Sequence, residues 1–323
     1  MLDFFSSLGS TIMTPLYFVT SVILAGWHWV FTSIGLSSDS GWTWVLSIVG
    51  LTVTIRALLI PLFVKQIKSS RNMQVLQPRV KELQKKYGHD RERLAQETMK
   101  LYQDAGTNPF ASCMPLLLQA PIFLALFRLL DNAAHGRAKG VLTDAQAESI
   151  EGAELLGAKI ADRFIDYYQG AAGTTWHVGA LTAGLVLLMT LTTFTTQRQL
   201  MRKNMPKDAL SGPYAQQQKI LLYVLPVVFA VGGIAFPVGV LLYWTTSNLW
   251  TMGQQFYVIR NNPAPGTPAF AAKQSRERKK GQAVTQDPLA PPEAAPPVVR
   301  TRQQPKKQSR SQRKGPAGGR SAS

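Results

Sequence analysis

Apolar residues in this chain gather into long blocks instead of alternating with polar residues. The blocks are Trp42–Val64, Phe110–Leu130, Val178–Thr196, Ile220–Phe236 and Val238–Ile259. A helix needs about 20 mostly apolar residues to cross the hydrocarbon core of a bilayer, and each block is close to that length. The pattern therefore predicts an all-α, polytopic membrane protein with a five-helix transmembrane core over residues 42–259.

A further block, Pro15–Leu36, contains no lysine or arginine but holds Trp27, His28 and Trp29. Aromatic side chains combined with a weakly polar face are typical of a helix that lies in the membrane interface. We therefore expect an N-terminal interfacial helix in residues 1–41. A spanning helix is the alternative interpretation.

Charge alternates between the segments that separate the blocks. Residues 65–109 hold ten Lys/Arg against five acids, whereas residues 131–177 hold four against seven. Residues 197–219 hold five against one, and residues 260–323 hold fourteen against three. Basic loops stay on the cytoplasmic side, so this alternation predicts a cytoplasmic C-terminus and an external loop at 131–177.

The basic segment 65–109 has the pattern of a helical hairpin. We place Pro78 in a first helical turn, where its missing N–H costs least. Gly88 and Asp90 then end one helix and begin the next. The prediction is a basic cytoplasmic hairpin that stands off the membrane.

The C-terminal segment 260–323 contains ten of the twenty prolines of the chain and few bulky apolar residues. Such a composition cannot bury enough surface to fold, so we expect a disordered, basic, Pro/Ala-rich tail.

One charge, Arg56, stands inside the first block. Burying a guanidinium in hydrocarbon costs about 2.5–3.5 kcal/mol on insertion scales, so it needs a partner or water. No acid occurs inside the five blocks, and Val64 lies eight residues beyond Arg56, too far for the side chain to reach the interface. We therefore expect a hydrated, positive pocket.

Polar groups in the other blocks support this pocket. They include Thr52, Gln119 and several hydroxyl or amide residues between Thr245 and Gln254. The alternative is that these groups are ordinary hydrogen-bonding contacts between membrane helices, worth about 0.6 kcal/mol each. That alternative accounts for many of them but leaves the unpaired arginine unexplained.

The sequence argues against catalysis. None of the four histidines lies in the five transmembrane blocks or has metal-ligand spacing, and Cys113 stands alone. We expect no enzyme activity, no metal and no cofactor. What remains is a site that receives something polar or acidic and releases it.

Four stretches resemble the YidC family of membrane protein insertases in order and spacing. They are TIRALLIPL, MQVLQPRVKELQKKYGHDRERLAQETMKLY, NPFASCMPLLLQAPIFLALF and FPVGVLLYWTTSNLWTMGQQ. The short external loop and the basic tail resemble actinobacterial-type members, which lack a large periplasmic domain.

The resemblance implies a five-helix core with a hydrophilic groove that is closed to the outside. It places Arg56, Thr52, Gln119, Trp244 and Asn248 in this substrate groove. It also implies a recruiting role for the hairpin. The hairpin residues concerned are Met73, Gln77, Pro78, Lys81, Lys85 and Lys86.

The implied function is insertion, folding and assembly of integral membrane proteins in the bacterial plasma (inner) membrane. The implied partners are nascent membrane proteins, the Sec translocon, the ribosome, signal-recognition targeting components and anionic lipid. A small-anion transporter or channel is the alternative, because Arg56 could bind an anion at mid-membrane. The sequence shows no internal repeat of the kind that transporters usually carry.

Overall fold

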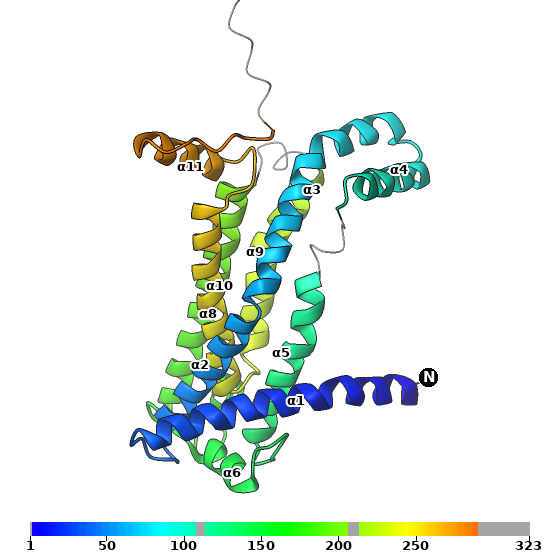
Figure 1. Ribbon diagram of the computed structural model, residues 1–323. Helices are drawn as coiled ribbons and strands as arrows, with labels where there is room; N and C mark the ends of the chain where they lie inside the picture. Colours follow the sequence, from blue (N-terminus) through cyan, green and yellow to red (C-terminus); the bar gives the residue numbers. More distant parts are fainter. Residues whose placement is uncertain (1, 108–113, 206–212, 290–323) are drawn as a thin grey trace, which may run out of the picture. The chain divides into compact units, whose positions relative to one another are not determined.

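The computed structural model describes residues 2–107, 114–205 and 213–289. It is almost entirely helical, as the apolar blocks predict, and Figure 1 shows the arrangement. The long helices are α1 (Leu2–Ser33), α2 (Gly41–Leu58), α3 (Ile60–Tyr87), α4 (Arg91–Asp104), α5 (Met114–Ala133), α8 (Trp176–Asn204), α9 (Pro213–Gly233), α10 (Val238–Asn261) and α11 (Pro268–Lys279).

The predicted apolar blocks fall on α2 with the start of α3, and on α5, α8, α9 and α10. In the described part of the chain, three helices are long and apolar enough to cross a membrane. They lie at Met13–Ser33, Gly41–Leu58 and Trp176–Asn204. The five-helix core stays a prediction, and residues 110–113 of the second block lie outside the described residues.

The core forms where α2 packs against α1 and α10, and where α10 also contacts α5 and α8. Trp44, Ile48, Leu51, Leu126, Leu129 and Leu241 are among its fully buried side chains. Helices α1 and α2 approach closely at Gly50, where an added Cβ atom would lie 2.6 Å from the Trp27 ring. Trp27 also donates from Nε1 to Thr54 Oγ1 at 2.9 Å. A glycine at position 50 is therefore what lets the indole lie against α2.

Helix α1 runs across the neighbouring long helices instead of parallel to them (Figure 1). It packs against α2 and α5. The imidazole ring of His28 on α1 stacks on the Trp44 ring of α2, with ring centroids 4.0 Å apart. One side of the helix stays exposed, including Phe18 and Trp29.

The block Trp42–Val64 is not one helix, because the chain breaks at Leu59 between α2 and α3. The break lies just before Pro61, which has no N–H to donate to the Ala57 carbonyl and whose ring crowds that carbonyl. The N–H of Leu59 still donates to Ile55 O at 3.1 Å. The break is therefore a local kink below Arg56.

Helices α3 and α4 form the predicted hairpin, and they pack against each other. Gly88 ends α3, and the Asp90 carboxylate accepts from the Arg93 N–H at 3.0 Å to begin α4, as predicted. The prediction for Pro78 is wrong, because this proline lies well inside α3 and not in a first turn. A proline inside a helix removes one backbone hydrogen bond and favours a bend, and Figure 1 shows α3 bending in its C-terminal half.

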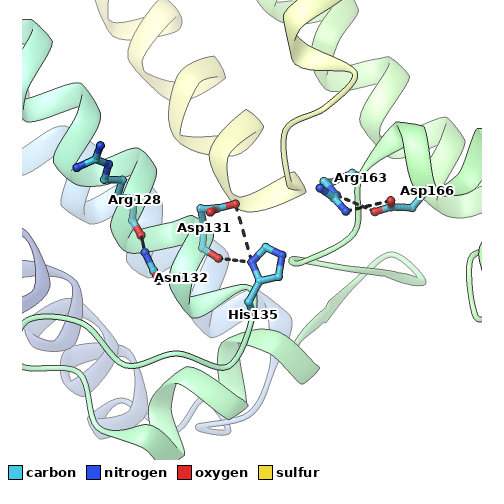
Figure 2. Close-up of polar contacts among 6 residues, drawn as sticks. All are labelled: Arg128, Asp131, Asn132, His135, Arg163 and Asp166. Carbon is cyan, nitrogen blue, oxygen red and sulfur yellow. Dashed lines mark hydrogen bonds and ion pairs between the residues drawn. The ribbon is translucent and has the colours of Figure 1, made fainter.

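The segment between α5 and α8 is folded. It contains α6 (Asp144–Gly152), an antiparallel pair of short strands and α7 (Phe164–Tyr168). The strands are β1 (Glu154–Leu155) and β2 (Ala158–Lys159). Figure 2 shows two local polar contacts in this region: His135 contacts Asp131 at the end of α5, and Arg163 pairs with Asp166 at 2.8 Å at the start of α7. This acidic loop is therefore an ordered cap on one end of the helices.

The structure differs from the expected disorder of residues 260–323 over its first part. Residues 268–279 form α11, which Thr267 begins by accepting from the Phe270 N–H at 3.3 Å. Phe270 is buried, and α11 packs against α8 and α10. One aromatic anchor is enough to hold a short basic helix, which composition alone cannot reveal. Residues 290–323 lie outside the described residues.

Candidate functional site

Arg56 lies in the last turn of α2 and points to α10. Its Nε donates to the Ser247 hydroxyl at 3.1 Å, and its Nη2 donates to the same oxygen. Ser247 is buried, and Arg56 is partly buried. The arginine is thus held between two helices by one neutral hydroxyl group.

Two further polar side chains extend this contact. Tyr243 lies one turn before Ser247 on α10, and the side chains of Ser247 and Gln119 are the polar neighbours of its hydroxyl group. Gln119 belongs to α5, so the four residues join α2, α5 and α10. We call Arg56, Ser247, Tyr243 and Gln119 the polar cluster.

The polar cluster holds one positive charge and no carboxylate. In the described parts of α2, α5, α8, α9 and α10, Asp131 is the one acidic residue, and it lies at the opposite end of α5 from Gln119. The guanidinium has more N–H donors than the two that Ser247 accepts. The Gln119 Oε1 atom is buried and has no hydrogen-bond partner in the described structure. The spare N–H donors of Arg56 therefore favour an anion, whereas the Gln119 Oε1 atom can accept only from a donor such as water.

A cavity of about 520 Å³ lies between α3 and α10, beginning one turn beyond the polar cluster. Ile60, Val64 and Ile67 line it from α3, and Trp250 and Tyr257 line it from α10. Its walls are mainly apolar, but the Trp250 Nε1 atom is buried with no partner among the described residues. The cavity is therefore mainly apolar, and one of its lining residues carries a buried indole N–H without a partner among the described residues.

The other predicted groove residues lie outside the polar cluster. Thr52 is buried, and its hydroxyl donates to Ile48 O at 2.7 Å within its own helix. Asn248 turns to α8, where its Nδ2 donates to Thr193 Oγ1 at 3.0 Å. Of the predicted set, the structure thus brings together Arg56 and Gln119, and it uses Asn248 to join α8 and α10.

Trp244 lies in an aromatic cluster beside the polar one. Its ring contacts Phe123 of α5 with centroids 5.0 Å apart, and Phe229 of α9 at 4.8 Å. Phe236 stacks on it at 5.7 Å. Phe123 also contacts Tyr243 at 6.2 Å, which links the two clusters. An apolar surface therefore borders the cation.

The predicted recruiting residues all belong to α3. Pro78, Lys85 and Lys86 are exposed, whereas Met73 and Lys81 are partly buried. The side chain of Gln77 lies outside the described residues. The Lys86 ammonium and the Arg93 guanidinium each lie 5.1 Å from the centre of the Tyr87 ring, which leaves the tip of the hairpin strongly basic.

Three polar residues outside the predicted groove set are prominent in the structure. Ser247 is one of the hydroxyl residues between Thr245 and Gln254 that support the predicted pocket, but nothing in the sequence singles it out as the partner of Arg56. Tyr243 was missed, and its spacing of four residues from Ser247 on α10 was the available signal. Arg128 is a second arginine in an apolar block. It is exposed at the end of α5 (Figure 2), and its Nη1 donates to the Tyr17 hydroxyl at 3.4 Å.

Comparison with known proteins assigns the family. The family model described as 60Kd inner membrane protein matches residues 35–265, which is most of the chain. A protein of Streptomyces avermitilis named membrane protein insertase YidC is 47% identical over 281 residues, covering 86% of this chain and 64% of that protein. The chain belongs to the YidC family.

More distant relatives carry the same name. The Tropheryma whipplei strain Twist protein is 35% identical over 291 residues, covering 86% of this chain and 94% of its own length. The Mycobacterium tuberculosis H37Rv protein is 32% identical over 286 residues, covering 80% of this chain and 74% of that protein. The chain thus spans less than two thirds of the Streptomyces relative but nearly all of the Tropheryma one.

Among the solved structures that are similar is an active YidC insertase with its first transmembrane domain resolved. It aligns with a TM-score of 0.43 and 24% identity, over 74% of this chain and 46% of that one. Membership of this family and the membrane-length helices identify a bacterial inner-membrane protein. In the part of the chain that the structure describes, no group of His, Cys, Asp and Glu side chains could hold a metal ion.

Proposed function

We propose that this protein inserts other proteins into the bacterial inner membrane through a hydrated, positive groove built on the polar cluster. The observation that carries the proposal is Arg56, which is held at α10 by the neutral Ser247 hydroxyl and faces no carboxylate in the described helices. An ionisable residue inside a membrane helix bundle is usually functional. The family name carried by the relatives supports the same function.

The first step is capture of a client's hydrophilic end. An acidic tail entering between α2, α5 and α10 would meet the guanidinium donors that Ser247 does not use. The buried oxygens Gln119 Oε1 and Thr245 Oγ1 have no partner among the described residues, and such atoms are commonly satisfied by water. Water in the groove shortens the hydrocarbon thickness that the tail must cross.

The second step is release of the client's apolar helix into lipid. The client's helix would find apolar surface in two places near Arg56: the aromatic cluster around Trp244, and the mainly apolar cavity between α3 and α10. Binding must be weak for release to follow, which suits one charge with hydroxyl neighbours. A membrane potential of 100 mV contributes about 2.3 kcal/mol for each charge that crosses, so no nucleotide is required.

The remaining parts of the chain receive roles in the same scheme. The basic α3–α4 hairpin and the C-terminus lie in the cytoplasm, where the hairpin recruits clients, ribosomes or signal-recognition targeting components. Helix α1 lies in the outer interface, which its crossing direction and its exposed Phe18 and Trp29 support. The protein assists folding and assembly of its clients, alone or beside the Sec translocon.

The test is insertion into proteoliposomes that contain only this protein. The client is a small single-span protein with an acidic tail, and protease protection measures translocation. Arg56→Ala is expected to abolish most insertion, whereas Arg56→Lys retains the positive charge and most activity. Arg128→Ala is the matched control, because it removes an exposed arginine from another apolar block. It is expected to insert like the wild type.

Equal insertion by all four proteins would overturn the role of Arg56 but keep the insertase. Failure of the wild type to insert, with circular dichroism showing a folded protein, would overturn unaided insertion. Flux of a small anion in the same vesicles would then favour a transporter or channel.

A further inference from the structure

A second cationic site lies where α8, α10 and α11 meet, at the end of the helices that carries the hairpin (Figure 1). It is a cavity of about 320 Å³. Lys203 enters it from the last turn of α8, Arg260 from the last turn of α10 and Arg276 from α11. We call this cavity the basic pocket.

None of these three cations pairs with an acid anywhere in residues 2–107, 114–205 and 213–289. The neighbouring Glu277 is turned to other partners: it lies 3.7 Å from Lys273, and its Oε2 accepts from the Thr285 N–H at 2.8 Å. The basic pocket therefore carries three positive charges with no internal neutralisation.

Arg276 is oriented by the backbone. Its Nη2 donates to the Arg260 carbonyl at 2.5 Å, which fixes the guanidinium beside the end of α10. Part of its role is structural, since a cation stabilises the carbonyl end of a helix. The guanidinium keeps further N–H donors after this bond, so it can also bind an anionic oxygen.

The pocket also has an apolar wall. Phe256 is 54% exposed on α10, and Ala272 is exposed on α11. Ile259 and Ala269 close the wall between them and are buried. A phosphate alone would be bound by the cations and would leave this wall in water.

We propose that the basic pocket binds an anionic phospholipid, with its phosphodiester among Lys203, Arg260 and Arg276 and an acyl chain along Phe256 and Ala272. The cations complement the phosphate, and the wall complements the chain. Basic pockets at the cytoplasmic ends of membrane helices commonly bind lipid headgroups. A nucleic-acid strand would use the cations but not the wall, so lipid fits better than ribosomal RNA. This site is separate from the polar cluster and does not depend on insertase activity.

The experiment uses the full-length protein in bilayer nanodiscs that contain a trace of photoactivatable phosphatidylglycerol, with the reactive group on the acyl chain. Mass spectrometry maps the labelled residues. A phosphatidylcholine probe with the same acyl chain measures labelling without net headgroup charge. Labelling by phosphatidylglycerol is expected on α10 and α11 around Phe256 and Ala272, well above that by phosphatidylcholine.

The test variant replaces the three pocket cations by glutamine at positions 203, 260 and 276. The matched control replaces Arg278, Lys279 and Lys280 by glutamine. These residues are exposed and do not line the pocket, and their replacement removes the same net charge. The pocket variant is expected to lose about tenfold or more of its phosphatidylglycerol labelling, because each surface cation contributes about 1 kcal/mol, or about fivefold, to anionic-lipid binding and three are removed. The control is expected to lose little.

A second variant guards against misfolding of the first. Ala272→Trp keeps all three charges and fills the exposed apolar wall, so it is expected to reduce labelling of Phe256. Equal labelling by the two lipids, or equal loss in the pocket variant and its control, would overturn the site. Loss of binding to a ribosomal RNA fragment by the pocket variant, with lipid labelling intact, would assign the cations to RNA instead.

Discussion

The polar cluster and the basic pocket use positive charge in opposite ways. The cluster holds a single guanidinium between helices, bonded to one hydroxyl group and partly buried. The basic pocket holds three cations at a helix end, two of them exposed. A charge surrounded by low-dielectric walls acts strongly alone, whereas exposed charges are screened and act in groups. One partly buried arginine in the polar cluster is therefore expected to attract an anion as strongly as several exposed cations do.

The largest effect is expected when the buried charge is neutralised in place. Ser247→Asp would set a carboxylate beside Arg56, and the two would form an internal ion pair. We expect insertion to fall at least as far as in Arg56→Ala, by about tenfold or more, because a buried pair has little attraction left for a client. Protease protection of the acidic-tailed client measures it.

Ser247→Asn is the control for this change, since it keeps a neutral hydrogen-bonding side chain at the same position. Full insertion by Ser247→Asp would show that the net charge of the polar cluster is irrelevant.

The next largest effect is expected when a packing contact of the basic pocket is removed while the polar cluster is left intact. Phe270→Ala removes the buried anchor of α11, and truncating a buried phenylalanine costs about 3–5 kcal/mol. We expect faster proteolysis between α10 and α11 and loss of lipid labelling in the basic pocket, with insertion unchanged. Ala271→Gly, at an exposed neighbouring position, is the control. A parallel loss of insertion would mean that the two regions are coupled.

A smaller effect is expected from salt. Raising the ionic strength shortens the Debye length to about 3 Å at 1 M, which screens exposed charges more than buried ones. Phosphatidylglycerol labelling of the basic pocket should therefore fall with salt, while the ratio of wild-type to Arg56→Ala insertion stays nearly constant. A ratio that collapses towards one would place Arg56 in contact with bulk solvent.

The smallest effect concerns the chain that folds back on α11. The Thr285 N–H donates to Glu277 and holds the pKa of that carboxyl below its usual value. Because the pKa of Glu277 is lower in the folded than in the unfolded protein, the contact stabilises the fold at pH values above the unfolded-state pKa. This stabilisation is lost as the pH falls through the folded-state pKa. The protection factor of the Thr285 amide against hydrogen exchange, corrected for the intrinsic pH dependence of exchange, should therefore fall more in acid than the protection factors of its neighbours. Glu277→Gln should remove this pH dependence, and an unchanged profile in that variant would contradict the assignment.

Much of the fold could be predicted from the sequence, because it rests on local signals. Long apolar blocks predict helices by length, and Gly88 and Asp90 mark the hairpin by their capping chemistry. Pro78 and α11 were missed for a shared reason. Neighbouring structure decides whether a proline can stay inside a helix, and a single buried residue, Phe270, decides whether a polar segment docks.

The candidate site could be predicted only in part. Arg56 is conspicuous because it is a charge in an apolar block, but its partner is one of many hydroxyl residues on α10. Hydropathy gives the depth of a residue and not the direction it faces. Thr52 and Thr251 illustrate this, since both hydroxyl groups donate to carbonyls of their own helices. Only the rotation of α10 against α2 identifies Ser247, and packing sets that rotation.

The kink at Leu59 has a mechanical consequence. Above it, α2 is clamped in the core by Trp44, Ile48 and Leu51, and below it α3 continues into the hairpin. The two helices have little contact beyond the kink itself. The angle between α2 and α3 can therefore change at Leu59 without breaking the core contacts of α2, and such a change would alter the cavity wall that Ile60, Val64 and Ile67 form.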